Sequence, residues 1–230
     1  MLSLNDVFSI DEIKAWINKI QRLDSEIDTK DLFIDIKMDG LACALIYQDG
    51  LLVTGATRGD GFVGEDVTNN IRTIESIPLT LRPDPLTKQF LVGRTEIRGE
   101  IVMYKQDFAN LNKLRARSNL PLFANPRNTA AGTIRQLDSI VVSKRQLYFR
   151  AYDLIRENAS EITTNLAVYR FLNRLGLITN PMAKEVKSIK EIESFINKWR
   201  DDKEKLEFNS DGLVIKLNKR ADKVDKYSYG

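Results

Sequence analysis

The sequence predicts an α+β fold in which antiparallel sheets are flanked by helices. Short β-type runs fill most of the first two-thirds of the chain, and the clearest helical periodicity lies toward its two ends. The β-type runs follow one another through hairpin signals instead of alternating with helices, and that order favours antiparallel pairing. A chain of 230 residues is long enough for one large domain or two small ones, with a sizeable core.

Three helices are predicted from the spacing of apolar residues. The first begins at a capping box, because Ser9 and Glu12 can each accept a hydrogen bond from a free backbone amide at a helix start. Apolar residues then recur at helical spacing over residues 13–20. The same spacing predicts two later helices, over residues 166–175 and 189–199.

The strands are predicted from alternation and from turn residues. Polar and apolar residues alternate over Leu32–Met38, and two apolar runs, Ala42–Tyr47 and Leu51–Gly55, flank Gln48-Asp49-Gly50. Asp-Gly between apolar runs is a hairpin signal, because both residues tolerate a positive φ. Further strands are predicted over Thr95–Met103, Leu147–Leu154 and Leu213–Leu217.

The composition excludes several kinds of chemistry. The chain has no histidine and one cysteine, Cys43, so it has no Ser-His-Asp triad, no imidazole-bound zinc and no internal disulfide. Acid–base and nucleophilic roles therefore fall to Lys, Arg, Asp, Glu, Tyr or Ser. No apolar run approaches the length of a membrane span, so a cytoplasmic protein is expected. The net charge of +3 does not by itself indicate a nucleic-acid partner, and any basic surface would have to be local.

Three charged residues share one face of the first predicted strand. Because side chains alternate along a strand, Asp35, Lys37 and Asp39 point one way, and Ile34 and Ile36 point the other way. Burying such charges costs free energy unless they neutralise one another or meet a ligand. A solvent-facing strand with alternating charges is the alternative interpretation of this segment alone.

Two later strands also carry charged residues. Glu96, Arg98 and Glu100 share one face of their predicted strand. Asp211 and Lys216 are five positions apart and would lie on opposite faces of a regular strand, so Asp211 is expected in the turn before it. The three strands would line one charged cleft if they met in space, which the sequence alone does not show.

Two loop segments add cations. Residues 56–64 form a glycine-rich loop that contains Arg58 and matches neither a P-loop nor a dinucleotide fingerprint, so its glycines are expected to shape a turn. Residues 125–135 predict a turn that leads into a short helix, with Arg127 and Arg135 suited to phosphate oxygens. Ordinary surface arginines would give the same pattern.

The segment Lys37-Met38-Asp39-Gly40 matches the Lys-x-Asp-Gly signature of the covalent nucleotidyltransferases, which include DNA ligases, RNA ligases and mRNA capping enzymes. Six further segments agree in order and approximate spacing, and with them the chain resembles the NAD-dependent bacterial DNA ligases over essentially its whole length. These segments are residues 56–61, 98–100, 123–128, 130–132, 135–138 and 211–216. The resemblance implies the nucleotidyltransferase fold of the DNA ligase and capping enzyme superfamily, with residues 1–230 as an adenylation domain.

The resemblance also implies the reaction. Lys37 would attack the α-phosphate of NAD, form a lysyl-AMP intermediate and release nicotinamide mononucleotide. The AMP would then pass to the 5′-phosphate of nicked double-stranded DNA, for joining during replication and repair. Asp39 and Asp211 match carboxylates that support this catalysis and the divalent metal, Mg²⁺ or Mn²⁺, and no residue is assigned as a direct metal ligand.

Residues that contact the nucleotide and the DNA are implied in the same way. Tyr152 matches the aromatic residue that stacks on adenine, a role that a flat ring can fill. Arg127 and Arg135 match arginines that are needed with nicked DNA and its phosphates. The other positions expected to bind the nucleotide are Ser3, Leu4, Asp35, Arg58, Glu100 and Lys216. The expected protein is a monomer that binds NAD, AMP and nicked DNA and no membrane.

The chain departs from the family pattern in two ways. Asp35 stands where bacterial ligases usually carry glutamate, so its reach toward the adenine edge is shorter by one methylene. The chain is also expected to lack the N-terminal module that binds nicotinamide, the last lysine motif and the modules that follow it.

Three other interpretations compete with an active adenylation domain. The first is a truncated, catalytically inert fragment that binds nucleotide or DNA. The second is an ATP-using ligase or capping enzyme that shares the lysine signature. A scaffold protein is the least favoured, since it leaves the charged strand faces without a purpose.

Overall fold

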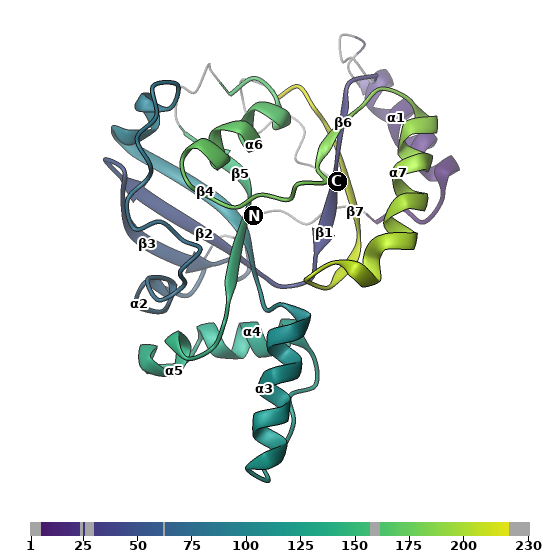
Figure 1. Ribbon diagram of the computed structural model, residues 1–230. Coiled ribbons are helices and arrows are strands. Elements are labelled where there is room, and N and C mark those ends of the chain that lie inside the picture. The colour runs from purple at the N-terminus through teal and green to yellow at the C-terminus, as the bar shows by residue number, and fades with distance from the viewer. Residues whose placement is uncertain (1–5, 24, 26–29, 62, 157–161, 221–230) are drawn as a thin grey trace.

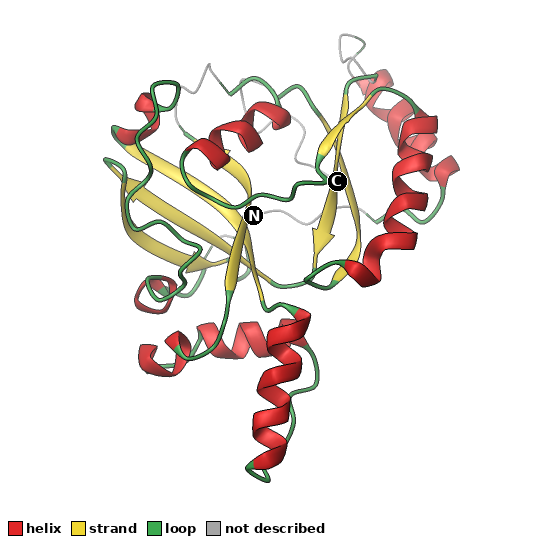
Figure 2. Cartoon of the chain, in the orientation of Figure 1, coloured by secondary structure: helices red, strands yellow, loops and turns green. Residues whose placement is uncertain are grey.

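Two antiparallel sheets with helices around them make up the part of the chain that the computed structural model describes (Figure 1, Figure 2). The described residues are 6–23, 25, 30–61, 63–156 and 162–220. The predicted α+β class, with antiparallel sheets and flanking helices, is therefore confirmed.

The larger sheet has four strands in the spatial order β3-β2-β4-β5, and each neighbouring pair is antiparallel. Its strands are β2 (Leu41–Gln48), β3 (Leu51–Thr57), β4 (Arg94–Val102) and β5 (Tyr148–Ile155). The predicted hairpin joins β2 to β3, and Asp49 and Gly50 both have positive φ values, 51° and 76°. Such values suit a tight turn between twisted strands.

The smaller sheet has three antiparallel strands in the order β6-β1-β7. They are β1 (Leu32–Met38), β6 (Lys184–Val186) and β7 (Ser210–Leu217). Two long helices, α1 (Ile10–Leu23) and α7 (Ile189–Asp202), lie beside this sheet (Figure 1). Leu32 and Ile34 of β1 pack there in one apolar cluster with Ile13, Ile192 and Phe195. One face of β1 is therefore apolar, and its opposite face is left for charged residues.

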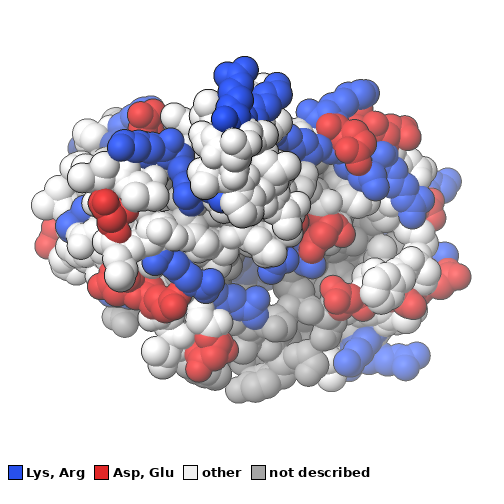
Figure 3. All heavy atoms as spheres, turned by 90° about the horizontal axis from the view of Figure 1, so that it is seen from below, with Lys and Arg blue, Asp and Glu red and all other residues white. Residues whose placement is uncertain are grey.

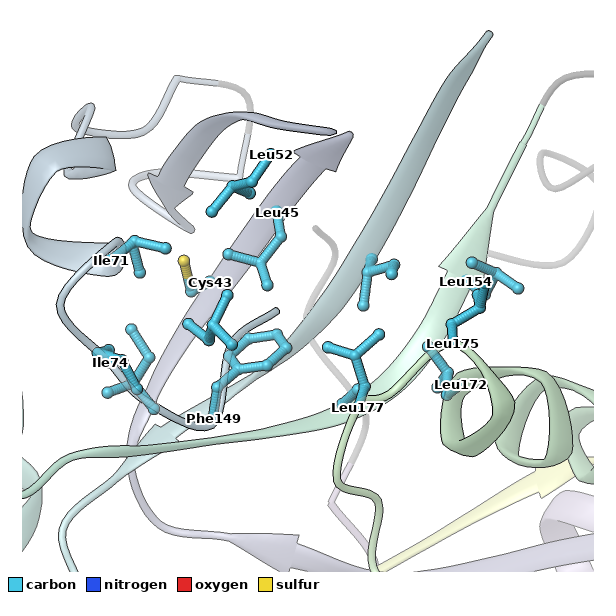
Figure 4. Packing of buried hydrophobic residues seen from close by; sticks show 14 of the residues in the cluster. Cys43, Leu45, Leu52, Ile71, Ile74, Phe149, Leu154, Leu172, Leu175 and Leu177 are labelled. Atoms are coloured by element: carbon cyan, nitrogen blue, oxygen red, sulfur yellow. The ribbon is translucent and has the colours of Figure 1, made fainter. Parts of the chain in front are cut away.

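The main hydrophobic core lies against the larger sheet and includes α6 (Asn165–Arg174) (Figure 4). Figure 4 shows Cys43 and Leu45 of β2 near Ile71, and Leu172 of α6 near the β5 strand. Burial raises the pKa of the Cys43 thiol to about 12, so this cysteine serves as a core residue and not as a nucleophile. The short elements next to the larger sheet are α2 (Thr68–Ile71) and η1 (Lys88–Leu91), and η2 (Lys203–Lys205) directly follows α7.

Side-chain caps fix where the predicted helices begin. The backbone N–H of Glu12 donates to Ser9 Oγ at 3.2 Å, as the capping box predicts. The Glu12 carboxylate accepts from the backbone N–H of Phe8 at 2.6 Å, one residue before the expected donor. Thr164 and Ser188 cap α6 and α7 in the same way. All three helices predicted from apolar spacing are confirmed.

A helical arm, residues 105–145, projects from the two sheets (Figure 1). It leaves the end of β4, returns to the start of β5 and contains α3 (Lys105–Arg117), α4 (Pro126–Ile134) and α5 (Ser139–Ser143). The Asn125 side chain caps α4 by accepting from the backbone N–H of Asn128 at 2.7 Å, and Pro126 begins the helix. The predicted turn and short helix are therefore confirmed. No residue of α3 is fully buried, and its Phe108 and Leu111 pack, half-buried, against the main core.

The chain crosses from the smaller sheet to the larger one at Asp39-Gly40. β1 ends at Met38 and β2 begins at Leu41, so two residues make the whole connection. A Cβ built on Gly40 would lie 2.3 Å from the carbonyl oxygen of Ile101 in β4. Glycine alone permits so close an approach. The glycine of the Lys-x-Asp-Gly motif therefore holds the lysine-bearing strand against the larger sheet.

Gly99 provides a test of the packing within the larger sheet. A Cβ there would lie 2.4 Å from Phe149 Cζ and 2.5 Å from the Arg150 carbonyl oxygen. Gly99→Ala is therefore expected to destabilise the fold by about 1–3 kcal/mol through overpacking. Gly132→Ala in α4 is the matched control, since its Cβ would meet nothing within 4 Å. There the helical propensity of alanine is expected to stabilise by roughly 0.5–1 kcal/mol.

Urea unfolding of the two variants measures both effects on one scale. Equal stability of Gly99→Ala and Gly132→Ala would contradict the close packing of β4 against β5.

Candidate active site

One face of β1 is apolar, and the other face carries Asp35 and Lys37 together with Phe33. Ile34 and Ile36 are buried in clusters that include residues of α7. Phe33 packs into the main core, so the face that also carries Asp35 and Lys37 is turned toward the larger sheet. The predicted alternation is confirmed for Asp35 and Lys37 against Ile34 and Ile36, whereas Asp39 lies just beyond the end of the strand.

Lys37 forms an ion pair with Asp211 of β7. Its Nζ lies 3.1 Å from Asp211 Oδ2, and the two side chains are 40% and 44% exposed. The expectation that Asp211 lies in a turn before the strand is wrong, because β7 begins at Ser210. The register shifts there, since Lys37 is paired with Gly212 and Met38 with Ser210. Asp211 is the extra residue of this β-bulge, and a bulge can re-aim a side chain in this way.

Glu100 of β4 lies close to the end of the Lys-x-Asp-Gly motif. The pKa of Glu100 is raised to about 8, chiefly by burial and also by the carboxylates of Asp39 and Asp211, although Arg127 lowers it. Arg127 Nη1 lies 3.1 Å from Asp39 Oδ1, so the helical arm is tied to the motif. Three carboxyl groups and a guanidinium thus share this part of the site.

A second bulge sets Tyr152 beside Lys216. In the pairing of β4 with β5, Gly99 is opposite Ala151 and the residue before it is opposite Asp153, which leaves Tyr152 as the extra residue. Lys216 Nζ lies 5.8 Å from the centroid of the Tyr152 ring, within the range of a cation–π contact. This contact joins β7 of the smaller sheet to β5 of the larger one.

The glycine-rich segment is a tight turn after β3. Gly59 has a φ of 54°, and a Cβ there would lie 1.7 Å from the carbonyl oxygen of Val63. The glycines therefore shape the turn, as the simpler interpretation predicted. The turn carries Arg58, whose backbone N–H donates to the Ala42 carbonyl at 3.0 Å. Burial raises the pKa of Tyr152 and the Arg58 charge opposes that rise, so the arginine is within electrostatic range of the ring.

Asp35 is buried, with 4% of its surface exposed, and its carboxylate already has hydrogen-bond donors in the protein. Asn180 Nδ2 donates to one oxygen at 2.6 Å, and the Tyr169 hydroxyl donates to the other. Burial raises the pKa of Asp35, while Tyr169 and the Lys216 charge work against the rise. Each carboxylate oxygen of Asp35 already accepts a hydrogen bond from a protein side chain. The expected contact of Asp35 with the adenine edge stays a prediction.

The two arginines expected to contact DNA lie at opposite ends of α4. Arg127 is in the first turn and 57% exposed, and it pairs with Asp39. Arg135 caps the C-terminal end and is 48% exposed, and its Nε lies 2.6 Å from Glu65 Oε2. Arg127 alone therefore has the helix-start position that suits phosphate oxygens.

The predicted site residues fall into two neighbouring groups, apart from Arg135 at the far end of α4. Ser3 and Leu4 lie outside the described residues. One group surrounds the lysine motif and consists of Lys37, Asp39, Glu100, Arg127 and Asp211. The other surrounds the Tyr152 ring and consists of Asp35, Arg58, Tyr152 and Lys216. Burial raises the pKa of Tyr152 most, and the charge of Glu100 raises it further. Glu100 is therefore near the Tyr152 ring, and the two sets of residues are neighbours.

Three residues that form hydrogen bonds to the predicted site residues were not predicted from the sequence. Tyr169 and Asn180 bind Asp35 from positions 134 and 145 residues away, and Glu65 binds Arg135 from 70 residues away. Tyr169 also fits the apolar face of its helix, so its spacing indicates a core residue. Nothing in the local sequence signals these partners.

Two absences hold for the described part of the chain. No helix in it is long and apolar enough to cross a membrane. The same residues contain no group of three or more cysteine, aspartate or glutamate side chains arranged to hold a metal ion.

The site and the fold together define a class of protein. A strand-borne lysine that pairs with a carboxylate, in a fold of two antiparallel sheets, suits the covalent nucleotidyltransferases that the Lys37–Gly40 motif indicates. Comparison with known families then narrows the class, because the family described as NAD-dependent DNA ligase adenylation domain matches residues 1–226. The chain belongs to this family, and the resemblance seen in its motifs is confirmed.

Curated relatives agree with the family. The chain is 46% identical over 222 residues to a DNA ligase of Thermomicrobium roseum, a match that covers 96% of this chain and 32% of that protein. It is 41% identical over 218 residues to a DNA ligase of Mycoplasma mycoides, with coverage of 95% and 31%. The chain thus spans about a third of the length of these relatives.

A solved structure resembles the fold at a lower level. A mycobacterial DNA ligase D complexed with ATP and MES is 13% identical, with a TM-score of 0.47 and coverage of 84% of this chain and 50% of that one. A similarity of that size supports no conclusion about the site.

The raised pKa of Glu100 is expected to make stability depend on pH. Because the folded-state pKa of about 8 exceeds the ordinary value of 4.5, folding favours the neutral carboxyl. Its stabilising contribution is full below about pH 4.5 and is lost as the pH rises through about 8. Glu100→Gln keeps a neutral side chain at every pH. The variant is expected to melt a few degrees above the wild-type chain at about pH 9, and at the same temperature at about pH 4.

Glu96→Gln on the same strand is the control, because the pKa of Glu96 is shifted in the opposite direction. Burial alone would raise the pKa of Glu96, but the Arg94 and Arg98 partners hold it below its ordinary value. This variant should therefore lose stability above about pH 4.5. A Glu100→Gln melting curve that tracks the wild-type curve at every pH would contradict the raised pKa of the Glu100 carboxyl.

Proposed function

We propose that this chain is the adenylation domain of an NAD-dependent DNA ligase, in which Lys37 takes AMP from NAD and passes it to nicked DNA. One observation carries the proposal: the Lys37 amine is held 3.1 Å from Asp211 Oδ2, and the Lys37 side chain is still 40% exposed. Gly212 is paired with Lys37 in the sheet, and a Cβ built on Gly212 would meet nothing within 4 Å. The surface beside Lys37 is therefore open. A fixed amine at an open surface can reach the phosphate of a bound nucleotide.

In the first step, the Lys37 amine attacks the α-phosphorus of NAD once it has lost its proton. A nitrogen–phosphorus bond forms, and the phosphorus–oxygen bond to nicotinamide mononucleotide breaks. The leaving phosphate takes the electron pair, and the nitrogen gives up its second proton to solvent. Negative charge grows on the phosphoryl oxygens as this happens. Arg58 and Lys216 are the cations that we assign to stabilise this charge.

The adenosine part of the nucleotide is assigned to the Tyr152 group. The ring of Tyr152 offers a flat surface for the base, with Lys216 Nζ 5.8 Å from its centroid. Glu100 is largely neutral below about pH 8, so it can donate a hydrogen bond to a ribose hydroxyl as well as accept one. Asp35 supports this lining from its buried position, and Ser3 and Leu4 are further proposed contacts.

Two carboxylates of the site offer oxygen donors for a divalent cation. Asp39 and Asp211 are the carboxylates that would hold the ion, next to Lys37 and Arg127. Mg²⁺ prefers such coordination, and Mn²⁺ accepts the same donors. The bound ion would supply charge neutralisation at the phosphates.

The second step transfers AMP to the 5′-phosphate at a nick, and we assign Arg127 and Arg135 to that partner. Both side chains are exposed, 57% and 48%, and cations of this kind neutralise DNA phosphates. Arg127 also pairs with Asp39, which brings the DNA contact next to the lysine motif. We further propose that the chain acts as a monomer in the cytoplasm.

Lys37→Ala is expected to abolish covalent labelling by NAD that carries a radioactive AMP group, because no other amine occupies the motif. The adduct is detected after denaturing electrophoresis. Lys190→Ala, an exposed lysine of α7, is the matched control and should label like the wild-type chain. Labelling that persists in Lys37→Ala would overturn the catalytic assignment.

The same assay separates the alternatives. Labelling by ATP in place of NAD would favour an ATP-using enzyme. If neither this chain nor the chain extended to the length of its relatives takes label, the inert binding fragment is the correct interpretation.

Arg127→Ala and Arg135→Ala are expected to slow AMP transfer to nicked DNA by about tenfold or more, since each removes a cation from the DNA phosphates. Labelling by NAD should change little in either variant. Arg174→Ala is the control, because Arg174 is a 47% exposed, ion-paired arginine on α6. Equal losses in both steps would reverse this division of roles.

A further inference from the structure

The basic charge of the molecule is concentrated in the helical arm. Residues 105–145 hold eight lysines and arginines against two aspartates, a net charge of +6 in a chain whose total is +3. The rest of the chain is therefore net acidic. Figure 3 looks at the molecule from the side of the arm and shows lysine and arginine side chains on it and beside it. A positive element that projects from a negative body favours a polyanion as its partner.

Two of these arginines lie against one aromatic ring. Arg115 Cζ lies 4.2 Å and Arg145 Cζ lies 5.3 Å from the centroid of Phe123. Arg115 Nε donates to the Pro121 carbonyl at 2.6 Å, and Arg145 Nη1 donates to Thr133 Oγ1 at 2.7 Å. These contacts hold both guanidinium groups in place. We call Arg115, Phe123 and Arg145 the arginine–phenylalanine cluster.

The cluster brings like charges together without an acidic partner. Within the described part of the chain, neither guanidinium lies within 4.0 Å of a carboxylate, whereas Arg127 and Arg135 each have one. Burial lowers the pKa of Arg145, and the charge of Arg115 lowers it further. Each guanidinium has five N–H donors, and the bonds above use one of each. Two fixed cations with spare donors are a receptor for an anion.

We infer that the arginine–phenylalanine cluster binds a backbone phosphate of duplex DNA, at a point on the arm apart from Lys37. The inference rests on the proposed function, in which nicked DNA is the partner. Guanidinium groups bind phosphate through paired N–H donors, and contact with Phe123 positions the two groups before the DNA arrives. The phosphate also offsets the repulsion between Arg115 and Arg145. A contact on the projecting arm lengthens the footprint on the duplex beyond the residues next to the nick.

The competing interpretation is that the two arginines only brace the loop that carries Phe123. Arg115→Gln and Arg145→Gln distinguish the two, because glutamine keeps a planar polar group near the ring and removes the charge. The probe is a fluorescently labelled nicked duplex, and the measurement is its dissociation constant across a salt series. We expect each variant to bind roughly five- to tenfold more weakly and to reduce the salt slope by about one.

Three controls accompany these variants. Arg170→Gln, an exposed arginine on α6, should leave both the affinity and the salt slope unchanged. Arg115→Lys and Arg145→Lys retain the charge and should retain most of the slope. Melting temperature and labelling by NAD should stay at wild-type values in all of them.

The outcomes separate this inference from the proposed function. A glutamine variant that melts earlier but keeps the wild-type salt slope supports the brace and overturns the inference. Unchanged affinity and slope in both glutamine variants, with a wild-type chain that binds DNA, overturn it as well. A wild-type chain that labels with NAD but shows no salt-dependent binding to the duplex overturns both the DNA partnership and the cluster.

Discussion

The missing side chain at Gly40 is the constraint on which the rest of the structure depends. The chain leaves the lysine-bearing strand and enters the larger sheet within two residues, and a Cβ at Gly40 would lie 2.3 Å from the Ile101 carbonyl oxygen. So short and close a crossing fixes β1 against β4. The charged faces of those strands, with Lys37 on one and Glu100 on the other, are held toward each other as a result. A larger residue would have to push the sheets apart, and the site would open with them.

Two β-bulges also position residues of the site. Each adds one residue to a strand, at Asp211 in β7 and at Tyr152 in β5, and each of these residues has a role in the proposed site. In a regular strand, Asp211 and Lys216 would point to opposite faces. The bulge lets the acid reach Lys37 while Lys216 stays near the Tyr152 ring. Local irregularity in pairing thus brings lysine, carboxylate and aromatic ring to one side of two sheets.

Much of the fold could be predicted because its signals are local. The Asp49-Gly50 hairpin, the Ser9 cap and the alternation along Leu32–Met38 each depend on neighbours in sequence, and each is confirmed. The bulges could not be predicted, because a register exists only once two strands are paired. The hydrogen bonds to Asp35 from Tyr169 and Asn180 could not be predicted either, because they join residues far apart in the chain. The motifs identified the family, and long-range pairing decided how the site is built.

In the proposed reaction, the amine of Lys37 becomes bonded to the phosphorus of AMP. A crystal structure of the chain soaked with NAD tests it directly. We expect electron density that runs without a break from Lys37 Nζ into an adenylate phosphate, with the adenine against Tyr152. A nucleotide bound elsewhere, with the 3.1 Å ion pair between Lys37 and Asp211 intact, would contradict it.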